Sequence, residues 1–278
     1  MRIMDRIVVS FTLLGAGAFS AHADLIGINY STGAVFSIST ADATATQIGQ
    51  TATGVMGIDR DAGGSLLAIT DGIVGKLGVL DEQSWHFDAV GNLGAGFTFE
   101  GGLAVNAGGE IYGGMRLAGS GRAIFRIDPD TGGMVRSVPL SRTSIDLNGL
   151  QFRDDGVLVA IDGVSGELVS VDVATGEVAT IAALLSPNPG AVGGLAVDGG
   201  TGFYVTAGTT SGSNGDNSLY RIDLYTGAQT FVGSLGSAAG SGFGIGALAG
   251  PVVPSPASAL LLAGVGALTV VRRRRAGR

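Results

Sequence analysis

The side chains in this sequence that could carry out acid–base chemistry are carboxylates. A group of aspartates occurs where one short apolar segment ends and the next begins: Asp59, Asp61, Asp154, Asp155 and Asp198. A facing pair of carboxyl groups can act as acid and base on a glycosidic bond. Aspartate at such a junction also caps a tight turn, because its carboxylate accepts backbone hydrogen bonds. We favour the turn interpretation, and a polysaccharide- or lactone-acting hydrolase or lyase is the alternative.

Histidine is too scarce for the common catalytic arrangements. The chain has 2 histidines, and after the N-terminal segment only His86 remains, beside the single tryptophan, Trp85. A nucleophile–histidine–acid set needs partners for His86 that the sequence does not indicate, and a zinc site needs several nitrogen or sulfur ligands. We therefore expect no enzyme, no catalytic residue and no bound metal. We interpret Trp85 and His86 as a surface aromatic cluster.

One long loop, Thr209 to Ser218, carries several hard oxygen donors. Asn214, Asp216 and Asn217 lie close together in it, and oxygen ligands of this type suit calcium. Their spacing does not match a known calcium loop, and a loop of this composition is typical of a flexible surface connection. We expect no cofactor, and weak calcium binding is the alternative.

A repeated phrase predicts the local structure around many of the aspartates. Three segments share it: Ile124 to Gly132 (IFRIDPDTG), Leu168 to Gly176 (LVSVDVATG) and Leu219 to Gly227 (LYRIDLYTG). Each alternates like a β-strand up to Asp128, Asp172 or Asp223, and Thr and Gly follow three and four residues later. Asp opens a tight turn and Gly supplies a positive φ, so the phrase predicts strand, turn, strand. Weaker copies without the glycine run from Val35 to Ala43 and from Leu77 to Trp85.

A second phrase precedes the first and sets the length of the repeat. It reads GLAV at Gly102 to Val105 and at Gly194 to Val197, with looser copies beginning at Gly149 and Gly57. The leading glycines are 45, 47 and 45 residues apart. Four short strands per unit of this length indicate a β-propeller blade. An open β-solenoid or a sandwich is the alternative.

The ends of the array indicate a closed ring. The first copy begins at its second strand, Leu25 to Asn29, and the missing strand lies at the other end of the body, within Gly244 to Gly250 (GIGALAG). Pairing of these segments removes exposed sheet edges. We therefore predict an all-β domain over residues 24–250 with five four-stranded blades. The body resembles propeller families whose blades carry a Leu-Tyr-x-Ile-Asp-x-x-Thr-Gly phrase, and that resemblance implies the fold alone.

The first 23 residues have the order of a secretory signal peptide. Arg2 and Arg6 form a basic start, an apolar run follows, and Ala21 and Ala23 provide a small-x-small cleavage site. The sequence predicts cleavage between Ala23 and Asp24. An N-terminal membrane anchor is disfavoured, because a spanning helix needs about 20 apolar residues.

The C-terminal segment, residues 251–278, has the order of a membrane sorting signal. Pro254, Ser255 and Pro256 precede an uncharged run over residues 257–271, which ends at Arg272, Arg273, Arg274 and Arg275. Basic residues are held on the cytoplasmic side while the apolar run enters the bilayer. The segment resembles the PEP-CTERM sorting signal, with Ser255 where the commonest version has Glu. That resemblance implies transient membrane insertion and an exosortase-type membrane enzyme as partner.

The length of the apolar run favours a processed signal over a lasting transmembrane helix. A helix over residues 257–271 would be about 22 Å long, short of the hydrocarbon core of about 30 Å. We therefore expect a sorting address, and a permanent anchor is the alternative.

The charge fits a soluble exported body, and the lack of cysteine means that its core alone must hold it together. The chain has 16 Lys and Arg, 23 Asp and Glu, and no cysteine. Most of the basic residues lie in the two terminal segments, so the body between them is strongly acidic and repels nucleic acid. We expect a secreted or cell-surface protein of the extracellular matrix that acts as a non-catalytic binding or structural propeller. Exopolysaccharide or other surface proteins are its expected partners, and nucleic acid is not.

Overall fold

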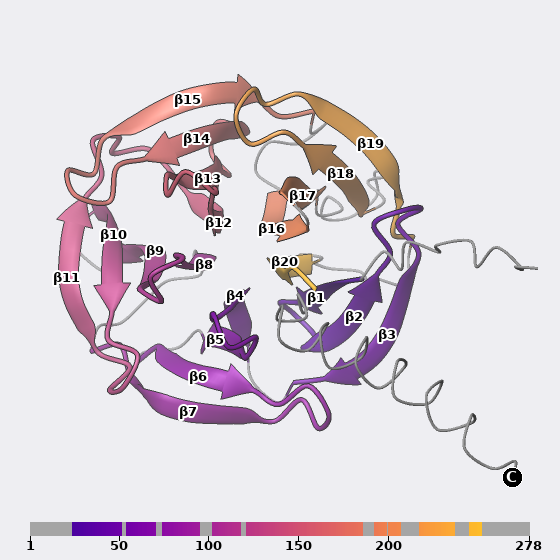
Figure 1. Ribbon diagram of the computed structural model, residues 1–278, viewed down its shortest axis with the longest axis horizontal. Helices are drawn as coiled ribbons and strands as arrows, with labels where there is room; N and C mark the ends of the chain where they lie inside the picture. Colours follow the sequence, from indigo (N-terminus) through magenta and orange to yellow (C-terminus); the bar gives the residue numbers. More distant parts are fainter. Residues whose placement is uncertain are drawn as a thin grey trace, which may run out of the picture.

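The body of the chain is a five-bladed β-propeller. The computed structural model describes residues 24–51, 54–70, 74–94, 102–117, 121–185, 192–198, 200–206, 217–236 and 245–251. These residues form five antiparallel sheets of four strands each, arranged around a common axis (Figure 1). No helix occurs among them. The predicted signal peptide and the predicted sorting segment from residue 252 lie outside the described residues.

Each blade is described from its innermost to its outermost strand. Blade 1 contains β20 (Ile245–Ala249), β1 (Leu25–Asn29), β2 (Ala34–Ile38) and β3 (Ala45–Gln50), and blade 2 contains β4 (Val55–Arg60), β5 (Leu66–Thr70), β6 (Lys76–Leu80) and β7 (Phe87–Asn92). Blade 3 contains β8 (Gly102–Val105), β9 (Ile111–Leu117), β10 (Gly121–Ile127) and β11 (Met134–Pro139). Blade 4 contains β12 (Leu147–Phe152), β13 (Leu158–Asp162), β14 (Glu167–Val171) and β15 (Val178–Ala183), and blade 5 contains β16 (Val192–Asp198), β17 (Thr201–Thr206), β18 (Ser218–Ile222) and β19 (Gln229–Ser234).

Burial falls from the axis outward within a blade. In blade 2, β4 and β5 are buried almost throughout, whereas β7 exposes its middle residues. Inner strands are apolar over most of their length because both of their faces are covered, whereas the outer strand has consecutive exposed residues.

The hydrophobic core is divided into five clusters that lie between neighbouring blades. The cluster between blades 2 and 3 joins Leu77 and Leu67 to Phe125 and Leu103, for example. Equivalent clusters join blades 3 and 4, blades 4 and 5, blades 5 and 1, and blades 1 and 2. Because every blade contributes to two clusters, the apolar contacts continue around the whole ring.

The C-terminal strand closes the ring. β20 pairs antiparallel with β1, with Ile26 opposite Ala249 and Ile28 opposite Ala247. The first blade is thereby composed of the two ends of the body, as the missing strand in the sequence predicted. The predicted fold class is confirmed: an all-β propeller of five four-stranded blades. Within the described part of the chain, no helix is long and apolar enough to cross a membrane.

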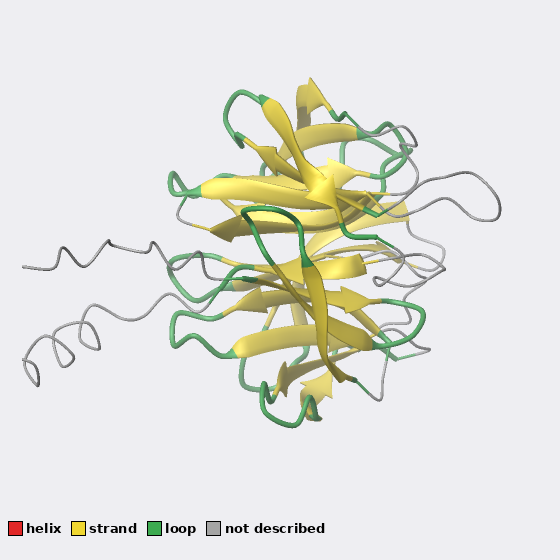
Figure 2. Ribbon diagram, turned by 90° about the vertical axis from the view of Figure 1, so that its right-hand side faces the viewer, coloured by secondary structure: helices red, strands yellow, loops and turns green. Residues whose placement is uncertain are grey.

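The strands run between two faces of the ring (Figure 2). We call one of them the turn face. It contains the turn between the third and fourth strand of each blade and, in blades 2 to 5, the turn between the first and second strand; in blade 1 the two ends of the body lie there instead. The connections on the other face, which we call the opposite face, join the second strand to the third and one blade to the next.

Candidate functional site

The axis of the ring, where propellers commonly bind ligands, is packed by backbone. Gly57, Gly102, Gly149 and Gly194 occupy equivalent positions on four inner strands. A Cβ atom at each would lie at most 2.8 Å from a leucine backbone nitrogen on the next inner strand. The glycine of the second phrase is therefore required by this close approach.

The space left on the axis is about one water molecule in size. The cavity lined by these glycines, Met56 and Asn148 has a volume of about 10 Å³, and a single water needs about that much. The cavity among the described inner strands is therefore too small to hold a sugar or a lactone.

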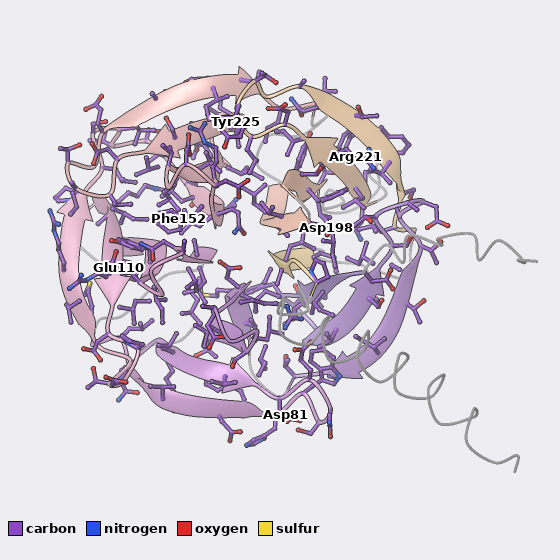
Figure 3. All side chains as sticks on the ribbon, viewed as in Figure 1. Asp81, Glu110, Phe152, Asp198, Arg221 and Tyr225 are labelled. Carbon is purple, nitrogen blue, oxygen red and sulfur yellow. The ribbon has the colours of Figure 1, made fainter. Side chains whose placement is uncertain are left out.

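The predicted aspartates lie at the turn face but do not form one cluster. Asp59 and Asp61 belong to blade 2, Asp154 and Asp155 to blade 4, and Asp198 to the end of β16 in blade 5. The inner strands follow one another around the axis in the order β20, β4, β8, β12, β16, so blade 2 adjoins neither blade 4 nor blade 5. Figure 3 shows Asp198 near the axis, whereas Asp81 lies at the perimeter.

Two of these aspartates stabilise the turns in which they lie. Asp61 Oδ1 accepts hydrogen bonds from the backbone N–H of Gly63 and of Ser65, both at 2.8 Å. Asp155 forms a bidentate pair with Arg153 (2.6 and 3.0 Å), and this pair lowers the pKa of the Asp155 carboxyl. Asp154 is exposed at the same turn. Turn formation accounts for Asp61 and Asp155.

Asp59 differs from the turn aspartates because it is buried between two blades. Its side chain lies on inner strand β4, where Oδ2 accepts from the backbone N–H of Val105 on β8 (2.7 Å) and Oδ1 accepts from Arg60 N–H (2.8 Å). Burial raises the pKa of the Asp59 carboxyl to about 7, although both hydrogen bonds act in the other direction. The other four blades have Ala104, Gln151, Ala196 and Ala249 at the equivalent position. A carboxylate where the other blades have alanine or glutamine can be seen in the sequence, but the burial of Asp59 was not predicted from it.

Arg60, the next residue, connects three segments at the turn face. Its Nε donates to the carbonyl oxygen of Gly250, directly after β20, at 2.9 Å. Its two terminal nitrogens form a bidentate pair with Glu82 (2.7 and 2.8 Å), and one of them also reaches the carbonyl of Gly64. The arginine thus holds the end of the closing strand against blade 2. This role of Arg60 was not predicted from the sequence.

Arg153 makes a comparable connection between blades 4 and 5. Its guanidinium lies 4.2 Å from the ring centroid of Tyr225, within the range of a cation–π contact. It also donates to the carbonyl of Leu224 (3.3 Å). Tyr225 keeps 53% of its surface exposed, whereas the Arg153 side chain is 14% exposed, so the aromatic ring is what this part of the turn face presents to solvent.

The repeated Asp-x-x-Thr-Gly phrase forms the same turn wherever it occurs. Asp128 Oδ1 accepts from the N–H groups of Asp130 and Thr131, and its carbonyl accepts from Gly132 N–H. Asp172 and Asp223 do the same. These bonds lower the pKa of each carboxyl, so the carboxylates stay ionised. Their predicted structural role agrees with these contacts.

The two weaker copies of the phrase keep this turn without glycine. Ala43 and Trp85 stand where the other blades have Gly132, Gly176 and Gly227, and all five residues have φ between 58° and 77°. The N–H of Ala43 donates to Ser39 O and that of Trp85 to Asp81 O. The turn geometry has therefore persisted where the glycine was lost.

Trp85 is buried, contrary to the expected surface cluster. Its exposed fraction is 7%, and its ring covers Gly49 on β3, where even a Cβ atom would overlap the indole. The indole N–H donates to Ile48 O (3.2 Å). His86 points to solvent, 3.5 Å from Asp88. Trp85 is therefore a wedge packed between blades 1 and 2, and His86 is a surface residue.

Most of the loop considered for calcium lies outside the described residues, including Asn214 and Asp216. Asn217 is described: it is buried, and its carbonyl accepts from Leu235 N–H (2.7 Å). Among the described residues no group of three or more metal-ligating side chains occurs. The signal-cleavage and sorting residues also lie outside the described part.

Comparison with known proteins finds one family and many similar folds. The family model described as "Repeat of unknown function (DUF6923)" matches residues 57–230. No curated protein matches.

Solved structures with a similar fold include three proteins with printed names. A virginiamycin B lyase from Staphylococcus aureus has 12% identity and a TM-score of 0.43, over 73% of this chain and 63% of the lyase. A putative gluconolactonase has 17% identity and a TM-score of 0.47, over 75% and 87%. Myxococcus xanthus glutaminyl cyclase has 19% identity and a TM-score of 0.47, over 77% and 75%. At these levels the similarity concerns the fold and assigns no activity.

Proposed function

This chain belongs to the DUF6923 family of repeats of unknown function, and we propose that it is an exported, non-catalytic propeller that an exosortase-type enzyme sorts to the cell surface. In this proposal residues 1–23 are removed before Asp24, and the segment after Pro251 enters the inner membrane transiently. The body then binds exopolysaccharide or other surface proteins through its exterior. Nucleic acid is not a partner, because the body is strongly acidic.

The observation that supports the non-catalytic role is the small size of the axial cavity among the described inner strands. Small-molecule sites are usually concave pockets of several hundred Å³, whereas the axial cavity has about 10 Å³. The carboxylates Asp61, Asp128, Asp172 and Asp223 accept hydrogen bonds within their own turns. These contacts support a scaffold with an exterior binding surface.

A second candidate function, a hydrolase or lyase, is favoured by one observation. A carboxyl group with a pKa near 7, such as that of Asp59, suits a general acid or base. Purified residues 24–251 should be assayed on a panel of glycans and lactones, with Asp59→Asn and Asp198→Ala as variants. The proposal expects no turnover. Turnover that either substitution abolishes would establish the second candidate instead.

The sorting part of the proposal is tested by the masses of the mature ends. In cells that contain the matching exosortase, we expect an N-terminus at Asp24 and a C-terminus that lacks Arg272 to Arg275. Replacing these four arginines by serine should leave the chain unprocessed. A native chain retained in the membrane of those cells with Arg278 intact would show a permanent anchor, and a chain retaining Leu13 would show an N-terminal anchor.

A further inference from the structure

Both ends of the described body lie at the turn face. β1 starts directly after Asp24, and β20 ends directly before Gly250. The two strands are neighbours, with Ile26 opposite Ala249 (Figure 1). The predicted mature N-terminus and the start of the sorting segment therefore leave the same face, next to each other and close to the axis.

The two faces differ in charge. At the opposite face the described carboxylates are Asp146, Asp162 and Glu167, and Glu167 pairs with Arg142 (2.8 Å). The remaining described carboxylates lie in or beside the connections of the turn face, where they far outnumber the arginines. They are Asp24, Asp42, Asp59, Asp61, Asp81, Glu82, Asp88, Glu110, Asp128, Asp130, Asp154, Asp155, Asp172, Glu177, Asp198 and Asp223.

The connection to the apolar run is short compared with the body. Residues 252–256 separate Pro251 from the first residue of that run, Ala257, and even a fully extended chain spans only about 20 Å over this distance. To turn the opposite face toward the membrane, the chain would have to cross a blade from axis to rim, about 14 Å at 4.8 Å per strand, and then run the length of a strand, about 20 Å. The connection is too short for that path.

Electrostatics keep the turn face from lying flat on lipid. Phospholipid headgroups occupy several Å outside the hydrocarbon core, and an anionic surface repels carboxylates within a Debye length of about 8 Å at physiological ionic strength. A connection of about 20 Å leaves room for the acidic face to stand off by roughly that distance.

We propose that, while its C-terminal segment is in the membrane, the chain holds the turn face toward the anionic lipid surface at a short separation and presents the opposite face outward. This inference rests on the proposed export and insertion. It implies that a surface partner meets the opposite face first, and that the exposed ring of Tyr225 becomes accessible to large partners only after release.

Single cysteines can test this orientation, because the natural chain has none. Asp154→Cys places a thiol in an exposed turn of the turn face, and Val164→Cys, 50% exposed, places one on the opposite face of the same blade. Asp130→Cys and Val74→Cys form a second pair in blades 3 and 2. The full-length chain should be labelled on spheroplasts of cells that lack the cleaving enzyme, so that both reagents can reach the outer surface of the inner membrane, with detached residues 24–251 as control.

A small maleimide reports on which side of the membrane the body lies, and a polyethylene-glycol maleimide reports which face a large molecule can reach. We expect the small reagent to label each of the four sites at the same rate in the membrane-bound chain as in the detached body. The large reagent should label Asp154→Cys and Asp130→Cys several-fold more slowly on spheroplasts than on the detached body, and the opposite-face sites equally in both.

The possible failures are distinguishable. Equal labelling by the large reagent at both faces of a membrane-bound chain would overturn the orientation and leave the proposed export intact. Protection of all sites from the small reagent would place the body inside the cell and overturn both.

Discussion

Blades 2 and 3 follow the same repeat, yet they differ at three equivalent positions on the turn face. Blade 3 has Ala104, Val105 and Gly132 where blade 2 has Asp59, Arg60 and Trp85. In blade 3 the turn backbone packs directly on the preceding outer strand, with Gly132 against Gly91.

In blade 2 the equivalent contact is made by side chains. Trp85 covers Gly49, and Arg60 holds Gly250 after the closing strand. Blade 2 adjoins the composite blade that contains both ends of the body. Blade 2 therefore differs from the repeated sequence at the positions where it contacts blade 1, which closes the ring.

The largest expected effect on stability comes from removing Trp85, the wedge between blades 1 and 2. Trp85→Ala removes a buried indole, which typically costs about 3–5 kcal/mol in the free energy of unfolding. Urea denaturation of residues 24–251 measures it. His86→Ala, at a neighbouring exposed position, should change stability by no more than about 0.5 kcal/mol. A loss for Trp85→Ala as small as that for His86→Ala would show that Trp85 does not hold blade 2 against blade 1.

The second effect concerns the arginine at the closing strand. Arg60→Met leaves Glu82 and the Gly250 carbonyl without their donor, and we expect a loss of about 2–3 kcal/mol. Arg126→Met is the matched control in blade 3, because Arg126 pairs with Glu110 while 46% of its side chain is exposed. Exposed pairs contribute about 0–1 kcal/mol. Similar losses in the two variants would contradict a special role for Arg60.

The third effect is a pH dependence due to Asp59. Because its pKa is raised to about 7 in the folded state, the folded chain binds the proton more tightly than the unfolded chain does. Stability should therefore increase as the pH falls from 7.5 to 5, by about 2–3 kcal/mol.

The same measurement on Asp59→Ala checks the assignment, since that variant should lose the dependence. The turn aspartates have lowered pKa values and lose their contribution only at pH values below about 4. A parent protein whose stability is constant between pH 7.5 and 5 would refute the burial effect.

The smallest effect concerns the turn that kept its shape without glycine. Ala43→Gly removes the backbone strain of an alanine with a positive φ of 61°, which should stabilise the fold by about 1 kcal/mol. It also removes a buried methyl group, which should destabilise the fold by about the same amount. The melting temperature should remain nearly unchanged. A large decrease would show that the packing of the methyl group dominates, and a large increase that backbone strain does.

The strands and turns could be predicted because each is determined by residues that are close together in the sequence. The Asp-x-x-Thr-Gly phrase specifies its own hydrogen bonds, and the 45-residue spacing of Gly57 and Gly102 predicts the blades. The absent strand before Leu25 predicted the closure. Each of these inferences needs only one short segment or the distance between two similar segments.

The features that the sequence did not predict depend on residues far apart in the chain. Trp85 is buried because Gly49 leaves space for its ring in another blade. Asp59 resembles Asp61 in sequence, and only the packing of β4 on β8 distinguishes a buried carboxyl from a turn cap. The axis is closed because each inner-strand glycine meets the backbone of the next strand. Such contacts follow from the assembled ring.

The closure of the ring by β20 is most directly tested by removing that strand. Thermal melting of residues 24–251 should be compared with that of residues 24–240, which lack β20 and the partner of Arg60. We expect one sharp transition for the longer chain. The shorter chain should melt broadly at a lower temperature or aggregate, because β1 becomes an open edge. A shorter chain that melts as sharply and at the same temperature would contradict closure by the C-terminal strand.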